Sequence, residues 1–224
     1  MKKGLKKVLS VLMIGALMVT SIMGFNINSF AASDSSECFV SDDINYHVYN
    51  VSTEEELKNA LLWANSGDYI QFSSDIRVSG NLEVANSVTI DLDNHSLMFA
   101  GSVRGLVIDS GYLNRVCIYN GCICGDIDSD AAVYVQSGDL RVYNCSIYAG
   151  NCYRHNILYY GNALCCASKS STITLEEVYL QGGNGYSKGI INPSRTGKAI
   201  YFSCVGSELL SLGKGYTVLN GQCK

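Results

Sequence analysis

Two short apolar patterns alternate along this chain at intervals that vary in length but keep their order. The first has two aliphatic residues separated by one residue, with the second aliphatic residue at Ile90, Ile118, Val142 and Leu175. The other places an aliphatic residue after a small one, at Leu106, Val133, Leu164 and Ile200. Their intervals are 28, 24 and 33 residues and 27, 31 and 36 residues. Constant short strands joined by loops of varying length indicate a stack of similar coils.

Stacked coils predict which side chains face inward. Equivalent residues of neighbouring coils lie about 4.8 Å apart, and side chains alternate along each strand. The aliphatic positions would then form an inner ladder, with Tyr119 and Tyr143 in an outer column and Asn120 and Asn144 at a strand end. A β-sandwich is the competing all-β fold, but it predicts Asn-Gly hairpin turns. That pair occurs at only three places, 120–121, 184–185 and 220–221.

One helix is predicted ahead of the repeats, over 53–65. Thr53 and Glu56 have the spacing of a capping box, and the first turn is acidic. Leu57, Ala60 and Leu61 follow at helical spacing. From Tyr69 onward the apolar runs have the length of strands.

These features resemble right-handed parallel β-helix proteins of the pectate-lyase-like superfamily. The resemblance covers most of 48–210 and is carried by Thr53–Leu61 with Gly67–Phe72, by Val88–Leu97 and by Ala132–Ile147. It implies an all-β fold, namely a right-handed parallel β-helix (a solenoid) with one N-terminal capping α-helix. It also implies an extracellular setting and polysaccharide ligands.

The first 31 residues have the layout of a secretory signal peptide. Four lysines precede an apolar run from Val8 to Met23, and Ser29-Phe30-Ala31 follows as a small-x-small site. We expect cleavage after Ala31, so that the protein is secreted and keeps no membrane segment; an uncleaved anchor is the alternative. The expected organisation is a signal peptide over 1–31, a polar segment over 32–47 and the β-helix domain over 48–224.

The charge of the secreted chain bears on its partners. Without the leader it has 12 basic and 20 acidic side chains, a net charge of −8, which argues against general nucleic-acid binding. Residues 33–150 hold 5 basic and 17 acidic side chains, whereas 151–224 hold 7 and 3. This asymmetry indicates either a surface for an acidic ligand in the C-terminal half or an N-terminal half that only increases solubility.

The preferred functional hypothesis is a secreted, non-catalytic protein that binds acidic extracellular or cell-surface polysaccharide. Aromatic rings stack on sugars, and cations pair with uronate or sulfate groups. The long loops 149–162 and 181–198, together with the outer tyrosines, supply such groups. The candidate carbohydrate-binding residues are Tyr119, Tyr143, Tyr148, Tyr153, Arg154, Tyr159, Tyr160, Tyr186, Lys188, Arg195 and Lys198. Alternatively, the tyrosines only shield the strand surface.

Two other functions remain open. In a Ca²⁺-dependent polysaccharide lyase, Asp126, Asp128 and Asp130 would hold Ca²⁺ against a substrate carboxylate. Arg154 or Lys198 would then remove the neighbouring proton. The Arg-x-Pro-x-x-Arg run that the resemblance implies for a lyase is missing, and a solvated acidic turn also explains the aspartates. The third function is a structural adhesin with a protein partner.

All ten cysteines lie between residues 38 and 223. An even count in a secreted chain predicts disulfides. We expect Cys122 or Cys124 to pair with Cys145 in the next coil, and Cys165 to face outward toward a loop cysteine such as Cys152. Cys166 is predicted to be a buried thiol. Without a CxxC motif, structural zinc is disfavoured.

Overall fold

The computed structural model describes residues 46–102, 104–153, 161–168, 171–184, 186–187, 190–191, 198–202, 210–212 and 217–219. Every described residue belongs to one compact unit, Val40–Lys224. The predicted signal peptide therefore lies outside the described residues. Within the described ranges, no helix is both long enough and apolar enough to cross a membrane.

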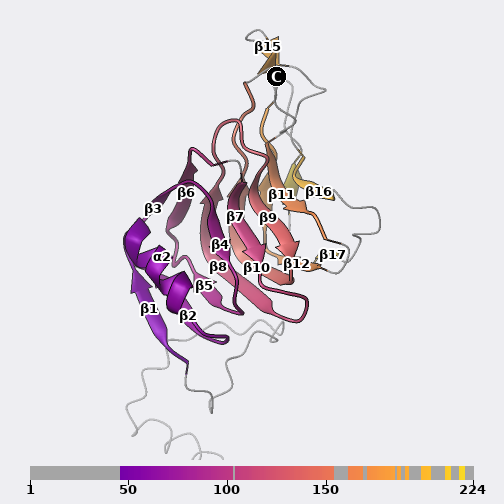
Figure 1. The fold of residues 1–224 in the computed structure, drawn as a ribbon. Coiled ribbons are helices and arrows are strands. Elements are labelled where there is room, and N and C mark those ends of the chain that lie inside the picture. Colours follow the sequence, from indigo (N-terminus) through magenta and orange to yellow (C-terminus); the bar gives the residue numbers. More distant parts are fainter. Residues whose placement is uncertain are drawn as a thin grey trace, which may run out of the picture. The chain divides into compact units, whose positions relative to one another are not determined.

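The described chain is all-β apart from one helix, and its two main sheets are parallel (Figure 1). The larger sheet has the strand order β1 (Val48–Val51), β2 (Tyr69–Phe72), β5 (Thr89–Asp91), β8 (Arg115–Cys124), β10 (Asp139–Tyr148), β12 (Thr172–Glu176) and β17 (Leu210–Leu212). A second row joins it through β8 and β10 and consists of β3 (Ile76–Ser79), β6 (Ser96–Ala100), β13 (Tyr179–Gln181) and β18 (Thr217–Leu219).

The smaller sheet has the order β16 (Ile200–Phe202), β11 (Asn162–Cys166), β9 (Ala131–Ser137), β7 (Arg104–Asp109) and β4 (Leu82–Val84). Within these two sheets every strand pair is parallel, as stacked coils require. The short strands β14 (Tyr186–Ser187) and β15 (Ile190–Ile191) form a separate antiparallel pair.

The strand registers confirm both sequence patterns. Ile118 lies opposite Ile90 on one side and Val142 on the other. In the smaller sheet, Val133 pairs in the same way with Leu106 and Leu164. Each apolar pattern therefore forms one continuous ladder.

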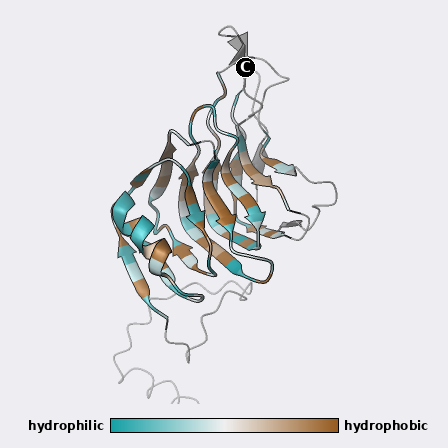
Figure 2. Cartoon of the chain, viewed as in Figure 1, coloured by the Kyte–Doolittle hydropathy of each residue, from teal (hydrophilic) through white to brown (hydrophobic). Residues whose placement is uncertain are grey.

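The core lies between the two sheets. One buried cluster contains side chains of both ladders, and Ile118, Val133 and Leu164 within it are fully buried. Figure 2 shows hydrophobic and hydrophilic residues alternating along many of the strands. The strand β11 is an exception, because all of its residues are buried. The chain's 22 glycines and single proline are compatible with many tight turns between these strands.

The predicted helix is confirmed as α2 (Glu54–Trp63). Thr53 is its N-cap, and the capping box with Glu56 is complete. Leu57 and Ala60 are buried in the core cluster. The helix therefore covers one part of the core with its apolar face, while Leu62 and Trp63 stay exposed.

Asparagines form a ladder at a corner between successive strand segments. Asn120 and Asn144 adopt left-handed backbone conformations, with φ of 55° and 49°. The Asn144 side-chain amide donates to Asn120 Oδ1 at 3.0 Å, and the Asn120 amide donates to Asp91 Oδ1 at 3.1 Å. Side-chain hydrogen bonds therefore link β5, β8 and β10 at this corner.

In the next coil the corner position holds Glu177, with φ of 53°. A left-handed conformation costs a residue such as glutamate roughly 1–2 kcal/mol, whereas asparagine tolerates it. We expect Glu177→Asn to raise the free energy of unfolding by about 1 kcal/mol, measured by urea denaturation. Glu176→Asn, one position earlier on the strand, is the matched control, and equal effects of the two changes would contradict this explanation.

Candidate functional site

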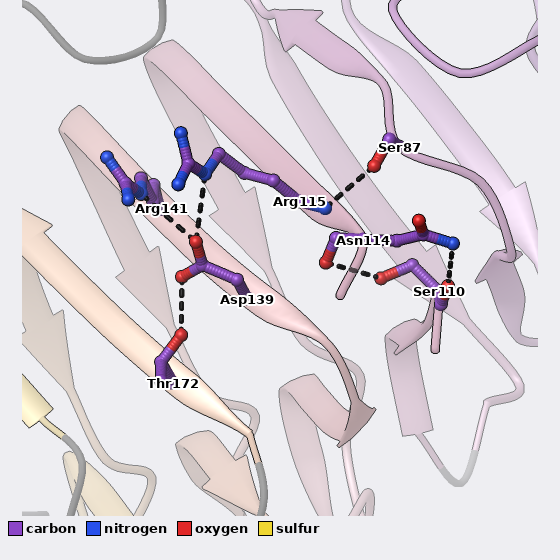
Figure 3. A network of polar contacts seen from close by, with 7 residues as sticks. All are labelled: Ser87, Ser110, Asn114, Arg115, Asp139, Arg141 and Thr172. Atoms are coloured by element: carbon purple, nitrogen blue, oxygen red, sulfur yellow. Dashed lines mark hydrogen bonds and ion pairs between the residues drawn. The ribbon is translucent and has the colours of Figure 1, made fainter. Parts of the chain in front are cut away.

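A charged network lies on the solvent side of the larger sheet, where β8, β10 and β12 run side by side (Figure 3). Asp139 is in register with Arg115 on one neighbouring strand and with Thr172 on the other. The adjacent residues Val116 and Leu140 are fully buried, so strand alternation directs the network side chains away from the core. The register of these parallel strands therefore places the groups together.

Asp139 is the centre of the network. Its Oδ2 accepts hydrogen bonds from Arg115 Nε at 2.8 Å and Arg141 Nε at 3.2 Å. Its Oδ1 accepts one from the Thr172 hydroxyl at 2.5 Å. Figure 3 shows the two guanidinium groups converging on one oxygen of this carboxylate. The Arg115 side chain is 41% exposed and that of Arg141 only 15%, so Arg115 is the more accessible cation.

The network favours the ionised form of Asp139. Partial burial by itself would raise the pKa of this carboxyl. The Thr172 hydrogen bond, the Arg115 hydrogen bond and the positive charges of both arginines outweigh burial and lower the pKa. Asp139 therefore stays charged at neutral pH and holds both arginines in place.

Hydrogen bonds in and around the turn before β8 fix the position of the Arg115 backbone. The Arg115 backbone N–H donates to Ser87 Oγ at 2.7 Å, and the Asp139 N–H donates to the Asn114 carbonyl at 2.9 Å. The Asn114 side-chain amide donates to the Ser110 carbonyl, and the Ser110 hydroxyl donates back to the Asn114 carbonyl at 3.3 Å. Local bonds therefore set the position of the first residue of the site.

Two tyrosines extend this surface along β8 and β10. Tyr119 and Tyr143 lie in register, with ring centroids 5.0 Å apart and planes within 10° of parallel. Both are half-buried. Burial raises the pKa of Tyr119, and the neighbouring Tyr143 adds to the shift. The Tyr119 phenol therefore remains a neutral hydrogen-bonding group at physiological pH, beside the two arginines.

Among the described side chains, the other predicted binding residues do not join this pair. Tyr148 lies beyond the Asn144 corner and contacts Tyr179, with ring centroids 5.4 Å apart. Tyr153 is 47% exposed, and Lys198 Nζ lies 5.1 Å from the ring centroid of Tyr201. Only the backbone of Tyr186 is described. Outside the described residues lie Arg154, Tyr159, Tyr160, Lys188 and Arg195.

The structure does not bring Asp126, Asp128 and Asp130 together around one point. Asp126 accepts a hydrogen bond from the Gly101 N–H, and Asp128 accepts one from the Tyr153 N–H at 2.5 Å. Asp130 Oδ2 lies 3.8 Å from Arg104 Nε, and burial raises the pKa of Asp130. Among the described residues there is no group of three or more His, Cys, Asp or Glu side chains that could hold a metal ion. The expected Ca²⁺ site is therefore not supported by this arrangement.

The predicted bond between Cys145 and Cys122 or Cys124 is not formed. The register pairs Cys145 with Gly121, so Cys145 is one position out of step with Cys122 and faces the core. Burial raises the pKa of the Cys145 thiol to about 12. Strand alternation puts Cys122 and Cys124 on the opposite face.

The structure confirms the predicted directions of the adjacent side chains Cys165 and Cys166, which lie on opposite faces of the smaller sheet. Cys166 is buried in the main core and pairs in register with Val135 and Phe202. Cys165 faces the other side of the sheet, where it packs in a small cluster with Val107, Ala131 and Tyr134. The Cys152 thiol donates to the Ser129 carbonyl at 3.8 Å. No two described cysteines lie at disulfide distance, so the expected Cys152–Cys165 bond is not observed.

The sequence reasoning missed Arg115, Arg141, Asp139 and Thr172. A signal for them was present, because each lies next to an aliphatic ladder position and all are polar. Reading the outer residues of each repeat across coils, in the same way as the inner ones, identifies them. The tyrosines and cations of the long loops favoured a binding site in those loops instead.

Comparisons of the chain with protein-family models, with curated proteins and with solved structures gave no match. What the protein binds must therefore follow from the chemistry of the residues described above. On the described part of the larger sheet, the charged network and the tyrosine pair are the candidate binding site.

The network predicts a pH-dependent stability. Because the pKa of Asp139 is lowered in the folded state, its contribution exists above the unfolded pKa, near 4, and is lost as pH falls through the folded pKa. We expect Asp139→Asn to destabilise the protein by about 1 kcal/mol at pH 7, since solvent partly screens this group, whose side chain is 20% exposed. Thermal melts should show the difference from wild type shrinking below about pH 4. Glu55→Gln on the exposed helix surface is the control, and a difference for Asp139→Asn that does not change with pH would contradict the assignment.

Proposed function

We propose that the protein is a secreted, non-catalytic right-handed parallel β-helix of the pectate-lyase-like type, which binds acidic polysaccharide on the outer face of β8, β10 and β12. Three rows of parallel strands support the fold proposal. One row contains Ile118, a second contains Ile123 and the third contains Val133, each paired with its equivalent in the next coil. A solenoid has this arrangement of repeated ladders.

The arginine pair anchored on Asp139 beside the tyrosine stack carries the functional proposal. A guanidinium has five N–H donors in a planar fork that matches a carboxylate or sulfate. Asp139 offsets part of the positive charge but orients both forks, which reduces the entropy lost when a ligand binds. Arg115 is the group with enough exposure to meet a ligand.

The tyrosine pair suits a sugar polymer rather than a small anion. Tyr119 and Tyr143 offer ring edges and hydroxyl groups along the stack of coils, where they lie beside Arg115 and Arg141 on the same strands. Sugars combine apolar C–H surface with hydroxyl groups, and the amphipathic tyrosine ring complements both. An extended polymer would contact equivalent positions of successive coils.

Binding of polygalacturonate to the Arg115→Gln variant tests the proposal. One charge-assisted hydrogen bond contributes about 1.5–3 kcal/mol, so we expect binding to weaken roughly tenfold or more. Arg77→Gln is the matched control, because Arg77 is an exposed arginine on β3, in the other strand row. Circular dichroism would verify that both variants keep the wild-type fold.

Two controls, ionic strength and a neutral glucan, decide whether the binding is specific for an acidic polysaccharide. Binding to polygalacturonate should fall as ionic strength rises, and a neutral glucan should bind weakly at any salt concentration. If wild-type protein binds no polyuronate or sulfated glycan, the proposal is wrong, and a pulldown from cells would then test the adhesin alternative. Equal losses for Arg115→Gln and Arg77→Gln would show that the site lies elsewhere.

A further inference from the structure

Cys122 and Cys124 form a close pair of thiols outside the core. Ile123 between them is fully buried, so both cysteines project to the other face of β8. Their sulfur atoms are 3.4 Å apart, and either thiol has the geometry to donate a hydrogen bond to the other. Both residues are only partly buried, which leaves them reachable by small molecules.

The neighbouring strands isolate this pair from other described cysteines. The registers place Ser96 and Ser146 beside Cys122, and Met98 and Tyr148 beside Cys124. Cys145 belongs to the next coil but faces the core. Each of the two sulfurs therefore has the other as its partner for oxidation.

We propose that Cys122 and Cys124 are a redox-active dithiol that exchanges with disulfides. In the first step the Cys124 thiolate attacks a disulfide R–S–S–R, forms a mixed disulfide and releases one thiolate. Cys122 then loses its proton to solvent and attacks Cys124 Sγ, which releases the second thiolate. Two protein thiols are oxidised to one Cys122–Cys124 disulfide, and the substrate disulfide is reduced to two thiols.

Strand geometry makes this disulfide readily reversible. Residues two apart in a strand have Cα atoms about 6.6–6.8 Å apart, at the upper end of the roughly 4.4–6.8 Å that a disulfide accepts. A disulfide at that limit is strained and therefore easily reduced. The pair is thus suited to exchange rather than to a permanent cross-link.

The local electrostatics assign the roles of the two thiols. The hydrogen bond from Cys122 lowers the pKa of Cys124 to about 7 and raises that of Cys122. Asp75 opposes ionisation of both thiols, and His95 Nδ1 lies 3.7 Å from its carboxylate. Arg77 is in register with Met98 on the same strand row. Cys124 is therefore the attacking thiolate and Cys122 the resolving thiol.

Reaction of the reduced, folded protein with oxidised glutathione tests the proposal. The chymotryptic peptide 120–134 holds these two cysteines and no other. We expect this peptide from wild type to lose two hydrogens and retain no glutathione. The Cys122→Ser variant should retain glutathione on Cys124 at ten times the wild-type level or more, because it cannot resolve the mixed disulfide.

A second treatment tests reversibility. Dithiothreitol under native conditions should restore both thiols of the wild-type peptide. Stable glutathione adducts on wild type, or a peptide that does not react at all, would overturn the proposal. A cross-link that dithiothreitol fails to reduce in the folded protein would also overturn it. The wild-type measurements require no substitution, so a poorly folding variant does not leave the question open.

Discussion

Replacing Ile118 by alanine should lower the free energy of unfolding by about 4 kcal/mol, within the range of roughly 2–5 kcal/mol found for such truncations. Ile118 is fully buried and stacks between Ile90 and Val142 in the central ladder. Its loss removes contacts to both neighbouring coils, and the paired strands prevent the cavity from collapsing. For a domain of this size the midpoint of thermal unfolding should drop by roughly 10 °C.

Ile127→Ala is the matched control for this prediction. The substitution is chemically identical, but Ile127 is 58% exposed in the turn after β8. Its effect should stay within about 0.5 kcal/mol. Equal destabilisation by the two substitutions, measured by chemical denaturation, would mean that Ile118 does not lie in a packed ladder.

The inner ladders could be predicted from the sequence because burial requires aliphatic residues at recurring positions. Each inward position needs an aliphatic side chain, so Ile90, Ile118 and Val142 recur at equivalent places. The capping box of Thr53 and Glu56 is a local pattern that needs no knowledge of the fold. The aliphatic recurrence follows from burial, and the capping box follows from the need of the first helical N–H groups for hydrogen-bond acceptors.

The wrong prediction for Cys145 shows that the face on which a side chain lies depends closely on the strand register. The strand period is two, so a shift of one residue moves a side chain to the opposite face. Cys145 is aligned with Gly121 rather than with Cys122, and that single step separates a core thiol from an outer pair. The proximity of two coils was predicted correctly, but proximity alone did not fix the direction of the side chains.

The candidate site was harder to predict because polar outer positions are not constrained by burial. Arg115, Asp139 and Thr172 come from three different coils, and only the strand register brings them into contact. Each alone has the appearance of an ordinary solvated side chain. Their network becomes visible when the outer residues are read across the stack, as with the Tyr119–Tyr143 pair that was predicted in this way.

Three backbone segments meet with almost no space between them near Gly150. A Cβ atom at Gly150 would overlap the backbone carbonyl of Asp126, and one at Gly183 would overlap the carbonyl of Gly150. Backbone hydrogen bonds close the same corner, from the Gly125 N–H to the Tyr148 carbonyl at 2.7 Å and from the Gly183 N–H to the Gly161 carbonyl at 2.8 Å. At Gly150 and Gly183, glycine is therefore required because of close contact, not because of a left-handed conformation.

Gly150→Ala should destabilise the protein by about 3 kcal/mol, the upper part of the usual range for overpacking. The obstructing atom belongs to the backbone and cannot rotate away as a side chain would. The Asp126 carbonyl also accepts the Ser129 hydroxyl at 2.7 Å, so displacing it breaks a second contact. Urea denaturation with far-ultraviolet circular dichroism measures the change.

Gly101→Ala separates the effect of contact from the general effect of adding a methyl group. A methyl group added at Gly101 would have no heavy atom within 4 Å, but the φ of this residue is +69°. Its substitution should therefore cost only the roughly 1–2 kcal/mol of a left-handed backbone. If Gly150→Ala proves no more destabilising than Gly101→Ala, the coils are not in backbone contact at this corner, and the close stacking of β8, β10 and the strands that follow them would have to be revised.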